Sequence, residues 1–256
     1  MITVKRDSCP TALNKQPEDF RENDFSNAEV KKTLLEMQHN KCCYCEVKLL
    51  VGTVVKEVDH HIPKSASDFK DEQGNVQWHL ANCWTNLLYA CRTCNNVKGT
   101  QHPFDEATGE RKLIDPSVEQ IDPEEHIDFI LGDVYMAHKV KGKTPLGTTT
   151  VGILKLSERS DLFGGFKRAA LEIRACGSEL LLAMVNDDTH EIDAKNNDLR
   201  KMASAHCEFA AFRRAFTAKV IREINETAIP ELESRFRRTF PRVEIPIPRG
   251  AEVVTT

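Results

Sequence analysis

The sequence predicts an α+β fold, in which a small metal-bound ββα unit precedes a mainly α-helical C-terminal domain. Two Cys-x-x-Cys pairs flank two short apolar runs that are typical of strands, and these predict the first part. Apolar residues that recur at helical spacing beyond residue 195 predict the second part. We therefore expect an N-terminal arm over residues 1–25, a ββα-metal domain over 26–104 and a helical domain over 105–256.

The composition restricts the class of protein. A chain of 256 residues with 40% hydrophobic residues can bury one sizeable core, or a small metal-bound domain and a helical partner domain. It contains no long uninterrupted apolar run, and its first ten residues contain no apolar stretch that resembles a signal peptide. These features argue against a transmembrane helix, so we expect a cytoplasmic protein with no membrane partner.

The charge pattern bears on nucleic-acid binding. A formal net charge of -4 argues against binding by bulk electrostatics alone. Residues 101–194 hold 10 basic and 18 acidic residues, whereas residues 195–256 hold 12 and 8, so we expect the acidic middle to face away from phosphate. Four basic residues near the C-terminus are candidates for contact with phosphate or an acidic partner: Arg213, Arg214, Lys219 and Arg222.

The elements around the first cysteine pair can be predicted in order. Residues 1–25 are polar and lack a clear period, which indicates an arm. Ser26 and Glu29 have the spacing of a capping box and predict the start of a helix, which Asn40 ends. Residues 53–58 are rich in β-branched side chains and predict a strand, which Pro63 cannot prolong. Residues 64–83 predict a long polar loop.

The second cysteine pair is preceded by a predicted strand and contained in a predicted helix. Residues 84–90 indicate a short strand, and residues 91–98 indicate a short helix that ends at Gly99. Residues 102–133 are rich in Asp, Glu and Pro and are expected to connect the two halves. The clearest later helix covers 195–225, where Phe209, Phe212 and Phe216 recur at helical spacing.

The two cysteine pairs are the strongest single signal. Two residues between the members of a pair let both sulfurs reach one tetrahedral ion, and two such pairs favour structural zinc. All four zinc positions would be filled by protein, which leaves none for substrate. The predicted ligands are Cys42, Cys45, Cys91 and Cys94. The five other cysteines are expected to be buried thiols: Cys9, Cys43, Cys83, Cys176 and Cys207.

Polar residues between the two pairs and directly after the second suggest hydrolysis of a phosphodiester. This reaction needs an activated water, neutralisation of charge on the phosphoryl oxygens and help for the departing oxygen. His60, with an ordinary pKa of about 6.5, can accept a proton from water near neutral pH. Asp59 and Asn95 offer hard oxygen ligands suited to Mg²⁺ or Mn²⁺.

Each residue also has a purely structural explanation. An Asp-His dipeptide alone indicates little in a chain with nine histidines. Asn86 can cap a turn, and Lys98 is equally a phosphate contact or a solvated cation at a helix end. Trp84 and Tyr89 are more often core residues than platforms for base stacking.

In combination, these residues resemble the HNH nuclease family. The pattern is Cys42-x-x-Cys45, Asp59-His60-His61-Ile62-Pro63, Asn86-Leu87 and Cys91-x-x-Cys94-Asn95-x-x-Lys98. The resemblance covers residues 41–99 and implies a ββα-metal nuclease domain. It implies His60 as the general base, with Asp59 and Asn95 as ligands of a catalytic Mg²⁺ or Mn²⁺. It further implies that Asn86 braces the loop that orients His60, and that Lys98 is a candidate phosphate contact.

One position departs from the family pattern. The residue after the catalytic histidine is commonly aliphatic in this family and is His61 here. Strand alternation places His60 and His61 on opposite faces, so only one of them can point at the metal. The family register favours His60.

The first half of the chain is similar to one subgroup, the HNH nuclease found beside an ATPase in Septu-type and retron-linked anti-phage defence systems. The likeness lies in the segments HNKCCYCE, EVDHHIPKS, WTNLLYACRTCNNVKG and KLIDPSVEQIDPEEHIDF. It implies an effector nuclease that attacks nucleic acid during phage infection, held in a complex with an ABC/SMC-like ATPase. We expect DNA rather than RNA as the substrate. We expect the partner to bind outside residues 41–99, on the acidic segment or the helical half.

Two alternatives stay open. A zinc-ribbon module that binds nucleic acid or protein without cutting it explains the cysteine pairs equally well. Asp59, His60 and Asn95 favour the nuclease, because a binding module needs no hard-ligand pair beside an imidazole. RNA, for example tRNA, is the alternative substrate, but nothing in the sequence indicates how a 2′-hydroxyl would be recognised.

Overall fold

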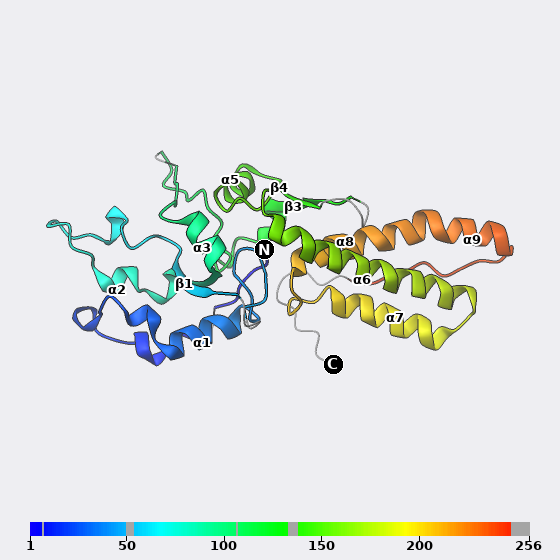
Figure 1. The fold of residues 1–256 in the computed structure, drawn as a ribbon, viewed down its shortest axis with the longest axis horizontal. Helices are drawn as coiled ribbons and strands as arrows, with labels where there is room; N and C mark the ends of the chain where they lie inside the picture. The colour runs from blue at the N-terminus through cyan, green and yellow to red at the C-terminus, as the bar shows by residue number, and fades with distance from the viewer. Residues whose placement is uncertain (7, 50–53, 106, 133–137, 247–256) are drawn as a thin grey trace. The chain divides into compact units, whose positions relative to one another are not determined.

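The computed structural model describes residues 1–6, 8–49, 54–105, 107–132 and 138–246. This part of the chain is α+β, mainly helical with two two-stranded sheets, as predicted (Figure 1). Two compact units are present: one comprises residues 1–128 and 140–158, the other residues 129–139 and 159–256. Within the described ranges, no helix combines the length and the apolar character needed to span a membrane.

The first unit contains the expected ββα order. Strand β1 (Lys56–His60) pairs antiparallel with β2 (Leu87–Cys91), and α3 (Arg92–Lys98) follows β2 directly and packs on both strands. The register places His60 opposite Leu87 and Asp59 opposite Leu88. Helix α3 ends at Gly99, whose φ of 54° lies in the left-handed region that favours glycine.

Several element bounds in this unit differ from the prediction. β1 extends to His60 because its pairing with β2 continues to that residue, and Thr53 of the predicted strand lies outside the described residues. β2 begins at Leu87 because residues Trp84–Asn86 form a 3-10 turn. The predicted loop over 64–83 contains a 3-10 turn (Ser67–Phe69) and α2 (Trp78–Ala81), and Phe69 packs with Ala66 and Ala81.

The first helix, α1 (Ala28–Met37), is capped by Asn27 and not by Ser26. The side chain of Asn27 accepts from the backbone N–H of Glu29 at 2.8 Å. The Glu29 carboxylate accepts from the backbone N–H of Thr11 at 2.9 Å, so it is unavailable for the predicted capping box. A contact distant in sequence therefore replaces the local one.

The N-terminal segment and residues 105–128 belong to the first unit, which differs from the expected arm and connecting segment. Met1, Ile2 and Val4 are buried. Three apolar residues are too few to show a period, so the sequence did not indicate that this segment packs. The backbone N–H of Ile114 donates to Oγ1 of Thr150 at 3.0 Å in α5 (Pro145–Ile153). The short α4 (Pro123–His126) also packs on α5.

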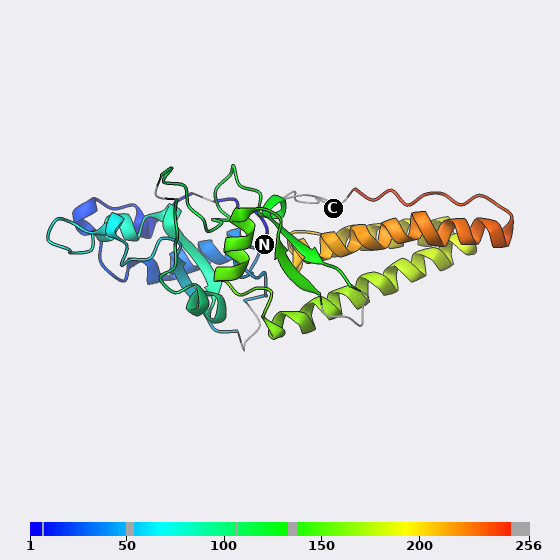
Figure 2. The same ribbon diagram turned by 90° about the horizontal axis from the view of Figure 1, so that it is seen from above.

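The second unit is helical. It contains α6 (Ser160–Val185), α7 (Thr189–Met202), α8 (Ala210–Glu223), a π-helical turn (Ile224–Ala228) and α9 (Ile229–Phe236). Helices α6, α7 and α8 lie side by side, and α8 runs on into α9 (Figures 1 and 2). Its core is aromatic: the ring of Phe212 lies 4.6 Å from that of Phe166 and 5.8 Å from that of Phe216, between centroids.

A second small sheet pairs β3 (Ile127–Ile130) with β4 (Lys139–Gly142). The division between the two units passes through both of these strands. The unit boundary therefore falls later in the chain than the predicted boundary at residue 105.

The prediction of one helix over 195–225 is wrong. Residues 203–209 separate α7 from α8, because Phe209 adopts a φ of 56° and packs its ring 5.0 Å from that of Phe166. Three of the four candidate basic residues are also engaged within the unit. Arg213 pairs with Glu172 at 2.6 Å and Lys219 pairs with Glu223, while Arg214 is buried.

Candidate functional site

Four buried cysteines come together as predicted. Cys42 and Cys45 lie in the turn after α1, Cys91 ends β2 and Cys94 lies in α3. Their Sγ atoms all lie within 4.8 Å of one another. Four thiolates this close repel one another unless a cation lies between them, and zinc prefers such a set. The cluster could therefore hold a metal ion such as zinc.

Hydrogen bonds place the first cysteine pair beside the second. The backbone N–H of Cys42 donates to Val47 O at 2.9 Å, which closes a tight turn. Gln38 attaches this turn to β2, because its Nε2 donates to Tyr89 O at 2.7 Å and its Oε1 accepts from Tyr89 N at 2.9 Å. The Sγ of Cys91 accepts from the backbone N–H of Cys94 at 3.5 Å, at the start of α3.

The remaining cysteines are only partly as expected. Cys43 and Cys176 are buried, but Cys9 and Cys83 are exposed and Cys207 is half-buried. Trp84 and Tyr89 are both buried, which agrees with their assignment to the core.

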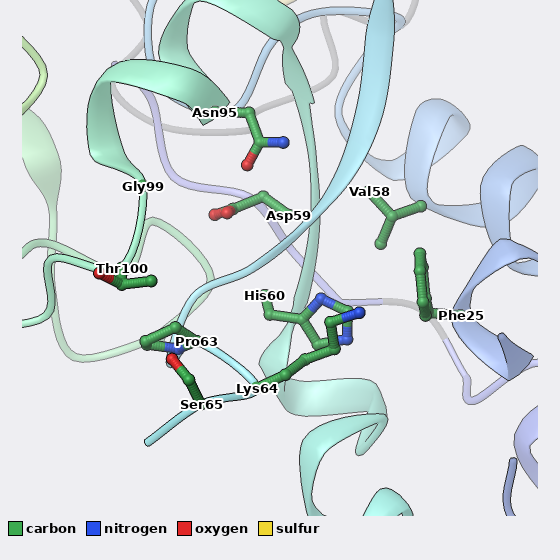
Figure 3. A pocket seen from close by; sticks show the side chains of 10 residues that line it. All are labelled: Phe25, Val58, Asp59, His60, Pro63, Lys64, Ser65, Asn95, Gly99 and Thr100. Atoms are coloured by element: carbon green, nitrogen blue, oxygen red, sulfur yellow. The ribbon is translucent and has the colours of Figure 1, made fainter. Parts of the chain in front are cut away.

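A pocket of about 360 Å³ opens at the end of β1. Figure 3 shows the side chains that line it, among them Asp59, His60 and Asn95. The fold therefore brings together three of the four predicted catalytic residues, from the end of β1 and from α3. Asn86, the fourth, does not line this pocket.

His60 presents one ring nitrogen without a partner. Its Nε2 lies 3.0 Å from Oδ1 of Asn82, and Nδ2 of Asn82 donates to the backbone oxygen of Arg21 at 2.8 Å. Because Oδ1 can only accept, Nε2 carries the proton and Nδ1 carries the lone pair. None of the described residues forms a hydrogen bond with Nδ1. Burial lowers the pKa of His60 to about 4, so the ring is neutral at neutral pH.

Asn86 holds the turn that follows His60. Its Oδ1 accepts from the backbone N–H of Ile62 at 2.8 Å, and its Nδ2 donates to the backbone oxygens of Ile62 and Ala81, both at 3.0 Å. The backbone N–H of His61 donates to Asn86 O at 2.9 Å. Asn86 therefore acts on the pocket through the backbone next to His60.

Asp59 and Asn95 place side-chain oxygens on the same pocket. Asn95 donates its Nδ2 to Glu57 at 2.7 Å, and its amide oxygen turns toward the Asp59 carboxylate (Figure 3). Asp59 accepts from the Tyr44 hydroxyl at 2.6 Å. Burial raises the pKa of Asp59, although the nearby Lys98 favours the charged carboxylate.

Lys98, expected as either a phosphate contact or a solvated cation at the helix end, is instead buried. Its side chain is 0% exposed, and its Nζ lies 3.0 Å from Oδ1 of Asp59 and 2.8 Å from the backbone oxygen of His60. The reason is that the last turn of α3 packs against β1 and directs Lys98 inward. It neutralises Asp59 and holds the strand end, and it does not line the pocket.

Four residues that the sequence did not single out belong to the site: Phe25, Glu57, Lys64 and Asn82. Lys64 lines the pocket, and its Nζ lies 5.0 Å from the ring centroid of Phe25. The Phe25 ring meets His60 edge-on, with 4.8 Å between centroids. Glu57 and Lys64 lie close to the Asp59-His60 pair in sequence, which is a weak local signal. Phe25 and Asn82 have none, because tertiary packing alone brings them to His60.

His61 faces away from this pocket, as strand alternation predicts. It is buried, and it lines a different cavity together with Asp115. Burial lowers the pKa of His61 to about 4. The two adjacent histidines therefore have separate surroundings.

Comparisons with known proteins identify relatives but no family model and no solved structure. The chain is 33% identical over 165 residues to the "Septu protein PtuB" of Bacillus thuringiensis, which covers 62% of this chain and 55% of that protein. It is 29% identical over 165 residues to the "Septu protein PtuB" of Bacillus mycoides (strain KBAB4), which covers 50% of this chain and 55% of that protein. The chain thus spans about half the length of the curated relatives it matches.

Proposed function

We propose that the protein is a metal-dependent endonuclease of the HNH type that serves as the nuclease of a Septu-type anti-phage defence system. One observation carries the proposal: a neutral imidazole, whose Nδ1 has no hydrogen-bond partner among the described residues, shares a pocket with the side-chain oxygens of Asp59 and Asn95. The HNH type rests on the sequence motifs and on the ββα order around four cysteines. The defence system rests on similarity to the two proteins named Septu protein PtuB.

His60 is the proposed general base. Its Nδ1 takes a proton from a water molecule, whose oxygen attacks the phosphorus, and the bond from phosphorus to the 3′ oxygen breaks. Asn82 keeps the ring in the tautomer that this transfer needs, because its Oδ1 accepts from Nε2. Lys64 lies in the pocket with 35% of its side chain exposed, so its charge can offset that of the phosphate.

Asp59 and Asn95 are the residues that would hold a catalytic Mg²⁺ or Mn²⁺. Mg²⁺ is usually bound by one or two protein oxygens together with phosphates, and these two side chains are hard oxygen donors on one pocket. The Asp59 carboxylate retains lone pairs, since each of its oxygens accepts one hydrogen bond. When bound, the ion would neutralise charge on the phosphate and on the departing oxygen.

The test is cleavage of plasmid DNA, and of RNA of equal length, by zinc-loaded protein with Mg²⁺ or Mn²⁺. His60→Ala should lose cleavage by roughly 10²–10⁴-fold, the usual contribution of a positioned base, while zinc content and nucleic-acid binding stay normal. His61→Ala is the matched control and should retain most activity. If His60→Ala cuts at the wild-type rate, the assignment of a nuclease to this pocket is wrong.

One observation favours a binding module that does not cut. Lys98 already pairs with Asp59 at 3.0 Å, and its positive charge opposes the binding of a divalent ion there. A calorimetric titration of zinc-loaded protein with Mn²⁺ separates the two functions. The nuclease predicts binding that Asp59→Asn and Asn95→Ala weaken, whereas the binding module predicts no binding at this pocket.

We further propose that the protein acts in a complex with an ABC/SMC-like ATPase. The similarity to Septu proteins supports a partner, and the sequence resemblance supports its class. Co-expression followed by size-exclusion chromatography tests the complex. A chain that always elutes without the ATPase would contradict it.

A further inference from the structure

A second cavity lies in the first unit, and the proposed mechanism does not use it. Its volume is about 550 Å³. Small-molecule sites typically measure roughly 300–1,000 Å³ and combine an apolar lining with a few converging polar groups. The apolar lining here consists of Ile62, Leu113, Val118, Ile121 and Leu146.

His61 supplies the first polar group of this cavity. The residue is 3% exposed, and its Nδ1 is buried without a hydrogen-bond partner. A buried polar atom without a partner costs free energy, so such atoms are rare unless a ligand or water meets them. The imidazole of His61 therefore lines the cavity and has one nitrogen without a partner among the described residues.

Asp115 and His126 supply the other polar groups. Oδ1 of Asp115 accepts from the backbone N–H and the hydroxyl of Ser117, at 2.9 and 2.6 Å, and Oδ2 has no hydrogen bond within the described residues. Nδ1 of His126 lies 2.8 Å from Oγ1 of Thr144, which leaves Nε2 for a ligand. The cavity thus offers one carboxylate oxygen and two imidazoles.

These groups exclude several ligand classes. Among the described residues, only the four cysteines bring three or more metal-ligating side chains together, so a metal ion does not fit this cavity. A small anion could pair with Arg111 but would also meet the carboxylates of Asp115 and Glu110 in the same lining, so an anion alone does not account for the cavity. A purely apolar ligand would leave Asp115 and His61 without partners.

We propose that this cavity binds the nucleobase of a nucleotide. A base offers N–H donors to Asp115, ring nitrogens and carbonyl oxygens to the imidazoles, and apolar faces to the aliphatic lining. The attached phosphate can pair with Arg111, whose side chain is 38% exposed and lies 3.5 Å from Asp68, a long ion pair. Free nucleotides and the bases of a bound strand share this chemistry. The site does not depend on the nuclease function.

The experiment is calorimetric titration of the full-length, zinc-loaded protein with the four nucleoside monophosphates. Ribose 5-phosphate, which lacks the base, is the control ligand. Asp115→Asn keeps Oδ1 for Ser117 but replaces the free carboxylate oxygen with an amide, and Leu146→Trp fills the cavity. Glu119→Gln is the matched control, because it also removes one negative charge, at an exposed residue close to Asp115 in sequence. A second series uses a short single strand and the same strand with one abasic position.

At least one monophosphate should bind. Asp115→Asn should weaken it tenfold or more, as expected for loss of a hydrogen bond to a charged group, and Leu146→Trp should weaken it at least as much because the indole occupies the space of the base. Glu119→Gln should stay within twofold of wild type. If only strand binding responds to these variants and to the abasic position, the base comes from the strand. If neither free nor strand binding depends on Asp115 or Leu146, or if ribose 5-phosphate binds as tightly as the monophosphates, the proposal is overturned. Zinc content and melting temperature show that each variant is folded.

Discussion

The two units of the molecule are stabilised by different kinds of contact. The first buries many polar groups, among them Asp59, Lys98, Asn82 and Asn86, and each of these is held by hydrogen bonds or an ion pair. The second buries mainly aliphatic and aromatic side chains around Phe212. Burial of polar groups costs free energy unless they are paired, so the first unit depends on its cysteine cluster and hydrogen-bond network. The proposed catalytic site lies in the first unit, where this free-energy cost of buried polar groups arises.

The largest difference between the units should appear when zinc is removed. Cys91→Ser should abolish zinc binding and unfold the ββα region, because binding to such sites contributes on the order of 10–16 kcal/mol. The second unit contains none of the four ligands and should keep its helices. Zinc analysis and far-UV circular dichroism measure both effects.

Cys9→Ser is the control for this substitution, since Cys9 is an exposed thiol outside the cluster. It should leave zinc content unchanged. A metal-free protein whose first unit remains fully folded would contradict the role assigned to the cluster.

The converse change is Phe212→Ala in the second unit. Phe212 is fully buried among other rings, so its loss should lower the free energy of unfolding by about 3–5 kcal/mol. Zinc content should not change. Phe236→Ala, at a side chain that is 43% exposed, should cost much less. Chemical denaturation with parallel zinc analysis tests the pair, and equal losses would show that Phe212 is not central to this core.

The buried surroundings of His60 should appear in the pH dependence of cleavage. Since burial lowers its pKa to about 4, the imidazole keeps its lone pair down to that pH, and kcat/KM should fall only at acid pH, as Nδ1 becomes protonated near pH 4 and as Asp59, whose pKa burial raises, loses its charge. A solvated imidazole would lose activity near pH 6.5 instead. Rates measured from about pH 3.5 to 8, with zinc content checked at each pH, distinguish the two. If the decrease of kcat/KM at low pH, the acid limb of the profile, lies near pH 6.5, the His60 imidazole is not held in these buried surroundings.

The smallest expected effect concerns Asn82 as a positioning residue. Asn82→Ala removes one hydrogen bond to His60, worth about 1 kcal/mol, and should slow cleavage roughly fivefold. The hydrogen bond raises the pKa of His60, so its loss should move the acid limb to lower pH. Asn82→Asp keeps the acceptor and adds a negative charge, and it should move the limb to higher pH. An acid limb that neither variant moves would leave Asn82 with a structural role alone.

Local sequence spacing was sufficient to predict part of the fold and site. The cysteine cluster and the ββα order followed from spacing, because the ligands of each pair lie within one turn. The separation of His60 from His61 followed from strand alternation. The α+β class and the helical second half also followed, since apolar periodicity is a local property.

Tertiary contacts account for what sequence reasoning could not predict. Lys98 has the sequence of an exposed helix end, yet α3 packs it against Asp59. Asn82 contacts His60 only in the folded chain, where its Nδ2 donates to the backbone oxygen of Arg21 and its Oδ1 is thereby turned toward the imidazole. The break between α7 and α8 depends on the packing of the Phe209 ring against Phe166 in the second unit. None of these contacts has a signature in neighbouring residues.

The separation of a structural ion from a catalytic one is the central claim. The most direct measurement adds Mg²⁺ or Mn²⁺ stepwise to zinc-loaded protein, with the proposed ATPase partner present, and follows cleavage, zinc content and melting temperature together. We predict no cleavage before addition and saturating cleavage after it, with stoichiometric zinc and an unchanged melting temperature throughout. Cleavage at the full rate by the zinc-loaded protein alone, or no cleavage with either ion, would contradict the claim.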